Sequence, residues 1–363
     1  MIDHTLFKNI ALAISAYSHE AYTNAKKLNG TAIVSSDARI SGDGESFIGQ
    51  MRWYKPQVPN INIASLTNAA AGTYTDLSTE VADYIKAART VGTQQVNLQS
   101  LISQQDGLAK MARDYAEHRA QDEHNAVLAV LKGVANYEVS RGPGIVAFDT
   151  DAGQAGTGFF VDINAAGVFG AAATDAATER KLIDNTAQGA ARGERLFRAL
   201  GMAYKDYEAD YMYMVTSPEL LADLRAANLV DSTVITEGNL VFQTIFGGKF
   251  RLLLTRAAQG NVAASANVND RSVKTTFLLK PGCVSFSPIA VPTPVEVQRN
   301  AEAYAGGGST SIWYRWAFIV HPLGYNWAGA TNAFASDTAY GTAGSWTRKV
   351  DALNLGILPI FHA

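Results

Sequence analysis

The most regular pattern of apolar and polar positions lies between Leu98 and Asn136. Helix-forming residues dominate this segment, proline is absent, and only Gly107 and Gly133 interrupt it. Apolar residues recur at helical spacing near both ends, so the pattern predicts one long helix with two buried ends. These positions are Leu108, Met111, Ala112 and Tyr115 at one end, and Val127, Leu128, Val130, Leu131 and Val134 at the other.

The middle of this expected helix is polar on nearly every face. The segment 117–125 contains Glu117, Arg119, Asp122 and Glu123 and almost no apolar residue. Because an unpaired charge is costly to bury, we expect this stretch to lie in solvent or against a partner rather than in a core. The apolar ends would then anchor the helix.

Residues 41–95 predict a long two-legged excursion. After a turn, residues 47–63 are extended and aromatic, and Pro56 and Pro59 exclude an interior helix. The run 81–91 fits either a helix or a strand that returns alongside the first leg. Such an excursion buries little by itself, so its side chains are candidates for contact with a neighbouring molecule. The candidates are Phe47, Met51, Arg52, Trp53, Tyr54 and Lys55.

The rest of the chain alternates short apolar segments with turn residues. Residues 6–28 have a helical period with a thin apolar stripe, which is typical of an arm that docks elsewhere. Ser217 and Pro218 predict the N-cap and first residue of a helix that follows an apolar strand at 211–215. We also expect a helix at 187–200 and loops with short strands at 137–180. Further strands are expected at 250–255, 275–279, 295–299 and 313–320, the last ending at His321 and Pro322, and 353–361 is a final apolar segment.

Length and charge limit the class of protein. The chain has 363 residues, with 30 Lys and Arg against 33 Asp and Glu, which allows about two domains or one discontinuous fold. A net charge of −3 argues against a protein whose main function is to bind the phosphate backbone of nucleic acids. The same low charge permits close packing of identical copies. Apolar runs are too short for a membrane helix. A single cysteine and an N-terminus without signal-peptide character favour a reducing cytoplasm.

The motifs predict no catalytic, cofactor or metal site. His118 and His124 are six residues apart, whereas ligands on one helical face are three or four residues apart. Asp149 begins a loop that resembles a calcium site but lacks the closing glutamate. Nucleophile-elbow, phosphate-loop and zinc-helix motifs do not occur in the sequence. We expect the glycines at 306–308 to form a hairpin tip and Cys283 to be a small buried side chain.

Several segments, taken in order, resemble one family. They are 97–135, 183–184 with 196–200, 214–221, 275–282, 294–300, 319–327 and 345–357. The first is similar to the family's spine helix, and 214–221 resembles its strand and helix cap, with Thr216 where many relatives have histidine. Together the segments resemble the major capsid proteins of tailed bacteriophages, the Hong Kong 97-type fold, and especially the lambda-like coat subunits.

The resemblance implies an α+β fold and a structural role. Its parts would be an N-arm at 1–40, an E-loop hairpin at 41–95, a P-domain with the long spine helix on an antiparallel sheet at 96–180 and 286–363, and an A-domain at 181–285. Such a subunit self-assembles into the icosahedral shell that encloses phage DNA. It has no active site, cofactor or metal.

The resemblance also implies partners. These are other copies of the chain in hexamers and pentamers, a scaffolding protein, a portal and, in some phages, a decoration protein. Packaged DNA would be met by non-specific proximity only, since acidic residues offset Lys110, Arg113 and Arg119 on the helix. No membrane contact is implied, and the location is the virion, with assembly in the host cytoplasm. Lys55 is the E-loop candidate for the covalent crosslink that some relatives form, although packing without crosslinks is the default expectation.

Two other classes of function remain open on sequence alone. A soluble enzyme with dispersed catalytic residues would show no linear motif, because many active sites assemble from distant positions. A phage tail or decoration protein would share the composition but would not need the long helix. The state of assembly separates these classes from a coat protein.

Overall fold

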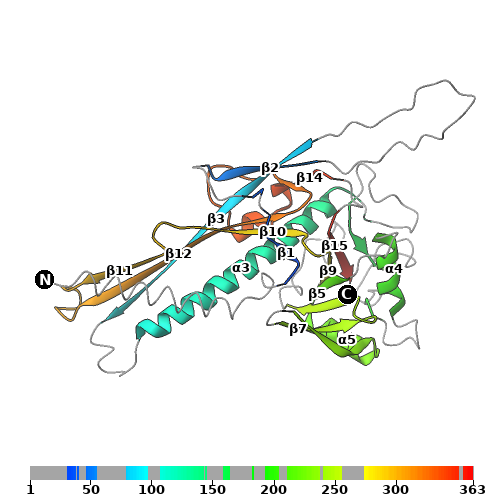
Figure 1. The fold of residues 1–363 in the computed structure, drawn as a ribbon, viewed down its shortest axis with the longest axis horizontal. Coiled ribbons are helices and arrows are strands. Elements are labelled where there is room, and N and C mark those ends of the chain that lie inside the picture. The colour runs from blue at the N-terminus through cyan, green and yellow to red at the C-terminus, as the bar shows by residue number, and fades with distance from the viewer. Residues whose placement is uncertain are drawn as a thin grey trace, which may run out of the picture.

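The computed structural model describes residues 31–37, 39–40, 46–54, 79–96, 107–142, 144, 158–163, 182–183, 193–203, 211–237, 240–255, 274–350 and 355–362. Two sheets and one long helix dominate this part of the chain (Figure 1). The α+β class predicted from the sequence, with a long helix on an antiparallel sheet, is confirmed.

A six-stranded sheet forms the elongated part of the molecule (Figure 1). Its central strand, β12 (Ser309–Pro322), pairs antiparallel with β3 (Thr79–Val96) over eleven residue pairs. On the other side of β12, β11 (Val295–Asn300) pairs with its first half and β10 (Val284–Ile289) with its second half. β1 (Val34–Ser35) adds a short parallel pair to β10. Because β11, β12 and β3 extend beyond the rest of the fold, they form a projecting arm.

The segment predicted as a two-legged excursion contains two strands. β2 (Ile48–Tyr54) pairs antiparallel with β3 from Thr79 to Ile85, whereas the remainder of β3 pairs with β12. The strand alternative for 81–91 is therefore confirmed, and the helix alternative is wrong. Residues 86–96 belong to the six-stranded sheet as well as to the returning leg. Lys55 and the rest of 55–78 lie outside the described residues.

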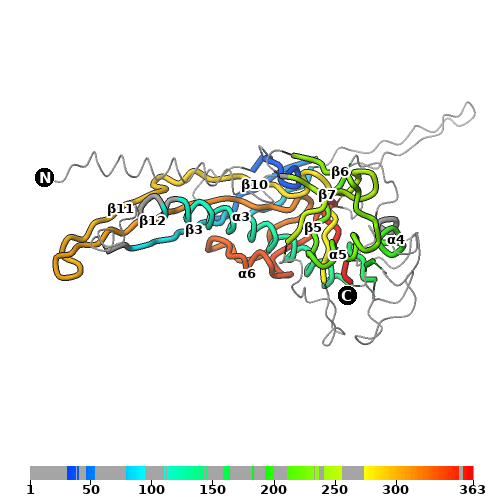
Figure 2. The backbone as a smooth tube through the Cα atoms, turned by 90° about the horizontal axis from the view of Figure 1, so that it is seen from below, coloured from blue at the N-terminus to red at the C-terminus, as the bar shows by residue number. Residues whose placement is uncertain are grey.

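The predicted long helix is present as α3 (Gly107–Ser140), which lies along one face of this sheet (Figures 1 and 2). Near its start, Tyr115 stacks on Tyr314 with ring centroids 5.8 Å apart, and the Tyr115 hydroxyl donates to the Ile312 carbonyl at 3.3 Å. Residues 98–106, which the sequence assigned to the same helix, lie outside the described residues. The helix and the sheet therefore form one two-layer unit along the arm.

Gly133 explains the close contact at the other end of α3. A Cβ atom there would overlap the Tyr340 carbonyl oxygen and would lie 2.5 Å from Nε1 of Trp346. The neighbouring Asn136 donates its side-chain amide to the Gly341 carbonyl at 2.9 Å. The elements in contact here are α6 (Asp337–Tyr340), a 3-10 helix η4 (Ala343–Ser345) and β14 (Trp346–Arg348), which pairs with β13 (Tyr325–Trp327).

A seven-stranded sheet forms the second part of the fold, in the order β4, β15, β9, β5, β8, β7, β6. These strands are β4 (Val161–Asp162), β5 (Met212–Thr216), β6 (Val230–Glu237), β7 (Leu240–Ile245), β8 (Phe250–Leu254), β9 (Lys274–Leu279) and β15 (Ile357–His362). The central strand β5 is buried along its whole length. The predicted strands at 211–215, 250–255, 275–279, 295–299 and 313–320 are confirmed, whereas β6, β7 and β10 were not anticipated.

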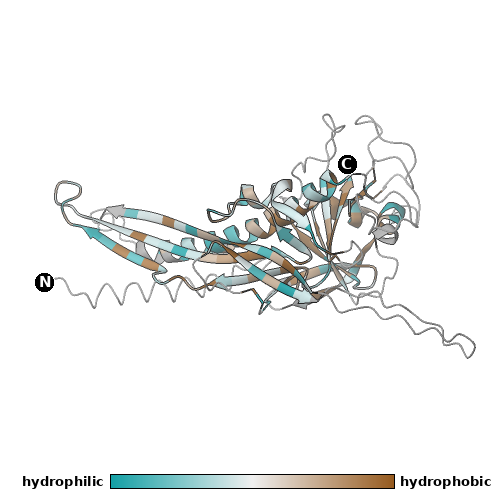
Figure 3. Ribbon diagram, turned by 90° about the horizontal axis from the view of Figure 1, so that it is seen from above, coloured by the Kyte–Doolittle hydropathy of each residue, from teal (hydrophilic) through white to brown (hydrophobic). Residues whose placement is uncertain are grey.

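Two helices belong to this second part. α5 (Pro218–Ala226) begins as predicted: the Ser217 hydroxyl accepts from the Leu220 amide at 3.4 Å, and Pro218 is the first helical residue. α4 (Glu194–Ala203) corresponds to the helix expected at 187–200. Figure 3 shows apolar stretches along the strands of both sheets, and one buried cluster connects the sheets and α3. The two parts therefore share a single core.

Candidate functional site

The E-loop candidates divide into buried and exposed side chains. Met51 is 2% exposed and packs with Ile40, Tyr84 and Ile319, because alternation along β2 turns it toward its own chain. The prediction that Met51 contacts a neighbouring molecule is therefore wrong. Trp53 is half-buried against the same cluster, and Arg52 is exposed.

Phe47 is also half-buried. It meets Phe334 edge to face, with ring centroids 4.9 Å apart, and Phe334 is itself 50% exposed. Tyr54 lies at the end of β2, and its side chain is outside the described residues, as is Lys55. Of the six candidates, Arg52 is the one that the described residues leave fully open to a partner.

The polar middle of α3 does not lie in solvent on every face. Glu117 and His118 are exposed as expected, whereas Glu123 is wholly buried and His124 is 6% exposed. The prediction that this stretch lies in solvent or against a partner is wrong for Glu123 and His124, whereas Arg119 and Asp122 are half-buried. The physical reason is that the facing strands supply polar partners to Arg119 and Asp122, and Arg119 in turn pairs with Glu123.

Arg119 and Glu123 form the most deeply buried of these contacts. The guanidinium Nε of Arg119 lies 2.9 Å from the Glu123 carboxylate, one helical turn away. The Nη1 atom of Arg119 donates to the Tyr314 hydroxyl at 3.3 Å. Burial alone would lower the pKa of Arg119, but the Glu123 charge and the Tyr314 contact outweigh it and raise that pKa. Arg119 therefore stays protonated, and through Tyr314 it connects α3 to β12.

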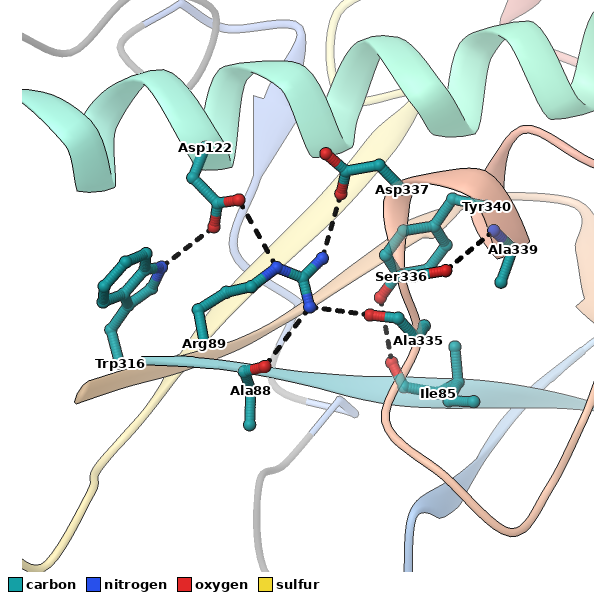
Figure 4. A network of polar contacts seen from close by, with 10 residues as sticks. All are labelled: Ile85, Ala88, Arg89, Asp122, Trp316, Ala335, Ser336, Asp337, Ala339 and Tyr340. Carbon is teal, nitrogen blue, oxygen red and sulfur yellow. Dashed lines mark hydrogen bonds and ion pairs between the residues drawn. The ribbon is translucent and has the colours of Figure 1, made fainter. Parts of the chain in front are cut away.

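Arg89 on β3 organises a second network (Figure 4). Its guanidinium contacts the carboxylates of Asp122 on α3 at 3.4 Å and of Asp337 on α6 at 2.9 Å. It also donates to the Ala335 carbonyl at 2.7 Å, and the indole of Trp316 donates to Asp122 at 3.0 Å. Figure 4 shows these groups converging between the helix and the strand. One arginine therefore joins three elements that are distant in sequence.

Burial changes the pKa of Asp122 in this network. The pKa of Asp122 is raised, because desolvation outweighs the attraction of Arg89 and the hydrogen bond from Trp316. Next to it, the Ser336 hydroxyl accepts from the Ala339 amide at 3.1 Å and caps α6. The Tyr340 hydroxyl, at 3.5 Å from the Ile85 carbonyl, completes the link to β3. Arg89, Asp122, Asp337, Ser336 and Tyr340 therefore each make a contact that links or caps elements of the fold.

A third polar cluster surrounds Glu138 near the end of α3. This buried carboxylate accepts from the Tyr325 hydroxyl at 3.0 Å, from the Phe159 amide at 2.8 Å and from Arg348 at 3.0 Å. Desolvation raises the pKa of Glu138, although Arg348 opposes it. The cluster connects α3 to the two-stranded β13–β14 pair and to residue 159, two residues before β4.

His321 and Ser285 form an unusual buried pair. They face each other in the register of β12 and β10, and both are 0% exposed. Among the described residues, no hydrogen bond of normal geometry reaches the Ser285 hydroxyl or either ring nitrogen of His321. Burial lowers the pKa of His321 to about 4, and the backbone of Tyr325 and the charge of Asp37 oppose this shift only in part. The imidazole is neutral at physiological pH and ends β12 as predicted.

Cys283 is buried as predicted, and desolvation raises the pKa of its thiol to about 12. The thiolate needed for nucleophilic chemistry is therefore disfavoured at this position. Within the described residues, no group of three His, Cys, Asp or Glu side chains is placed to hold a metal ion. No helix in the same part of the chain is long and apolar enough to cross a membrane.

No protein-family model matches the chain, and no curated protein is similar to it. Solved structures do match. The head structure of Helicobacter pylori bacteriophage KHP40 matches with a TM-score of 0.45 and 10% identity, over 93% of this chain and 90% of that chain. The cyanophage Pam1 capsid matches with a TM-score of 0.46 and 12% identity, over 91% of this chain and 88% of that chain. The capsid of Ralstonia phage GP4 matches with a TM-score of 0.47 and 11% identity, over 91% of this chain and 87% of that chain.

All three are phage heads or capsids. In the described residues, the three polar clusters connect α3 to the strands that pack around it.

Proposed function

We propose that this chain is a major capsid protein of a tailed bacteriophage, which self-assembles into the icosahedral shell that encloses phage DNA. The observation that carries the proposal is the architecture, a long helix joined lengthwise to a projecting antiparallel sheet beside a second, compact sheet. The ordered sequence segments that resemble this family fall on those same elements. A role without catalysis is part of the proposal.

The contacts of α3 support a structural role. Arg119 with Glu123 and Arg89 with Asp122 and Asp337 fix the helix on the sheet through charged groups that need exact geometry. A subunit that holds neighbours at fixed angles needs such a stiff connection. An enzyme would be expected to direct some of these groups into an open pocket instead.

We further propose the division implied by the resemblance: an N-arm at 1–40, an E-loop at 41–95, a P-domain at 96–180 and 286–363, and an A-domain at 181–285. Within these ranges, α3, β11 and β12 belong to the P-domain and the strands from β5 to β9 to the A-domain, and β15 of the P-domain range pairs with β9. Since β3 pairs with β12, the end of the E-loop segment would be continuous with the P-domain sheet.

The proposed partners are other copies of the chain in hexamers and pentamers, together with a scaffolding protein, a portal and, in some phages, a decoration protein. The location would be the virion, with assembly in the host cytoplasm. The exposed side of α3 would face the packaged DNA without specific binding, because Glu117 and the half-buried Asp114 offset its exposed cations, Lys110 and Arg113.

The test is the state of assembly of the purified full-length chain, alone and expressed with a candidate scaffold. Sedimentation velocity and negative-stain microscopy should show capsomers, shells or tubes. A protein that stays a small oligomer over the whole concentration range, with or without the scaffold, would contradict the proposal and favour an enzyme. Stacked rings of uniform diameter, without closed shells and without tubes of hexagonally packed subunits, would favour a tail protein.

A further inference from the structure

A row of residues crosses the six-stranded sheet at His321. Ser35 of β1 pairs with Ser285 of β10, and Ser285 pairs with His321 of β12. The imidazole meets the ring of Tyr84 on β3 edge to face, with ring centroids 6.4 Å apart. Tyr84 in turn lies over its register partner Gly49 on β2, where an added Cβ would overlap the phenol ring. His321 therefore lies in the middle of a row that starts at the edge strand β1.

The surroundings of His321 suit a neutral imidazole and not a charged one. His321 and Ser285 are wholly buried, and the ring of Trp346 on β14 packs near the imidazole with centroids 6.2 Å apart. A protonated imidazole here would be a buried cation with two N–H donors, and within the described residues no carboxylate forms a hydrogen bond with it. Such a cation is unfavourable. Protonation therefore favours any opening of the structure that brings water to this ring.

Several titratable or charged groups lie around His321. They are Asp37 and Arg39 after β1, Tyr84 and Lys86 on β3, Tyr325 on β13 and Arg348 on β14, whereas β10 contributes Ser285. The charge of Asp37 and the backbone of Tyr325 favour a protonated His321, but burial outweighs both. Arg39 holds the Asp37 carboxylate, with Nε at 2.9 Å, and lowers its pKa. Asp37 thus stays ionised in weak acid, and His321 is the group of this set that titrates there.

The part of the structure that can open most easily lies at the edge of the sheet. We call residues 31–37 and 39–40 the edge segment. Within the described residues, its strand β1 forms two residue pairs with β10, whereas β12 forms six with β10 and eleven with β3 (Figure 1). Two more hydrogen bonds hold it, from the Gly282 amide to the Ala32 carbonyl at 2.7 Å and from the Val284 amide to the Ile33 carbonyl at 3.3 Å. Local opening is easiest where few hydrogen bonds are lost.

The edge segment also covers the row. Ile33 is buried in the main core, and Ile40 packs with Tyr84 and Ile319 in the small cluster beside His321. Asp37 lies between these two anchors. Movement of the edge segment would therefore expose the end of the row at Ser35 and Ser285 and admit water toward the imidazole.

We propose that His321 is a proton-controlled latch for the edge segment: the neutral imidazole keeps the segment closed on the sheet, and protonation releases it while the rest of the sheet stays folded. This inference concerns a single subunit and does not depend on the proposed function. The pKa of His321 is about 4 in the closed state and would return to its ordinary value of 6.5 once water reaches the ring. Lowering the pH from 7 to 5 should then raise the equilibrium constant for opening roughly twentyfold.

The test is hydrogen exchange of the purified full-length chain at pH 7 and pH 5, read by mass spectrometry. Exchange times are scaled for the pH dependence of the intrinsic rate, and sedimentation verifies the same state of assembly at both pH values. We expect the amides of Val34, Ile40, Gly282 and Val284 to lose protection roughly tenfold or more at pH 5. Amides at 310–319 on β12 should keep their protection.

Variants assign the effect to His321. His321→Phe and His321→Gln cannot take up the proton and should abolish the difference between the two pH values; the second serves if the first does not fold. His118→Gln removes an exposed imidazole on α3 and should keep the wild-type difference. Asp37→Asn should increase exchange at both pH values, because it weakens the contact with Arg39, and should leave their ratio unchanged. If neither His321 variant folds, this unchanged ratio excludes Asp37 and supports His321 as the titrating group.

Three outcomes contradict the inference. One is a pH response that persists in His321→Phe or His321→Gln, and another is a response that disappears in His118→Gln or Asp37→Asn. The third is equal protection of the edge segment at both pH values, or a loss of protection at pH 5 that includes 310–319 and so reports global unfolding.

Discussion

Single side chains show most clearly where local sequence determines structure and where it does not. Ser217 and Pro218 signal a helix start within five residues, and the structure contains that cap. Glu123 carries no such signal. Its burial depends on Arg119 and on Tyr314, and the Arg119–Tyr314 contact spans 195 positions in sequence. A polar residue at a buried position can be recognised only when the partners that pair with it are known.

His321 gives a pH-dependent prediction. Its pKa is about 4 in the folded chain and 6.5 in an unfolded one, so between these values the unfolded chain binds more protons. The stability due to the neutral imidazole is complete above about pH 6.5 and is lost as the pH falls toward about 4, by up to about 3 kcal/mol. Urea unfolding of wild type and His321→Phe from pH 7 to 4 should show a smaller loss in the variant. His118→Gln, at an exposed position, should keep the wild-type slope. Equal slopes for all three proteins would contradict this account.

Helices and strands were predicted best where their pattern is local. The apolar ends of α3 and the strands β5, β8, β9, β11 and β12 follow from spacing and turn residues. β6 and β7 were missed because exposed apolar side chains, such as Val234 and Val241, break the alternation of apolar buried and polar exposed positions expected of a strand. Gly133 was seen only as an interruption of a helix. Its reason lies in Tyr340 and Trp346, about 200 residues away, which no local pattern reveals.

Gly133→Ala should therefore reverse the usual effect of this substitution. In an ordinary helix interior, alanine is more stable than glycine by about 1 kcal/mol. Here the added methyl group would overlap the Tyr340 carbonyl and approach the indole nitrogen of Trp346, so we expect a loss of roughly 1–3 kcal/mol. Gly344→Ala is the matched control, since nothing lies within 4 Å of its added Cβ. Thermal unfolding of both variants measures the difference, and a Gly133→Ala protein as stable as wild type would show that α3 and α6 are not in close contact.

In the whole molecule, α3 has two sides with different roles. One side pairs its charges with the sheet, through Arg119, Asp122 and Glu123. The other side exposes Lys110, Arg113, Glu117, His118 and Gln121. The sequence alone could not separate these sides, because both are polar and the distinction depends on which strands lie beneath the helix. In the proposed shell, the exposed side of α3 faces the packaged DNA. Glu117 and the half-buried Asp114 balance Lys110 and Arg113, so this side gives phosphate no net attraction.

The two sides should respond differently to added positive charge. Glu117→Lys with Gln121→Lys changes exposed positions one turn apart, so the subunit should fold and its particles should retain more nucleic acid. That excess should disappear as salt is raised, because it comes from phosphate contacts. The ratio of nucleic-acid to protein absorbance of purified particles, after washes at increasing salt, measures the effect, with Glu117→Ala as the control for loss of the carboxylate alone.

Glu123→Lys instead places a second cation beside Arg119 inside the interface, where an unpaired charge costs roughly 3–5 kcal/mol. We expect that variant to lose cooperative unfolding and to build no particles. If the exposed pair also unfolds the subunit, both sides of α3 are buried and the proposed orientation toward DNA is wrong.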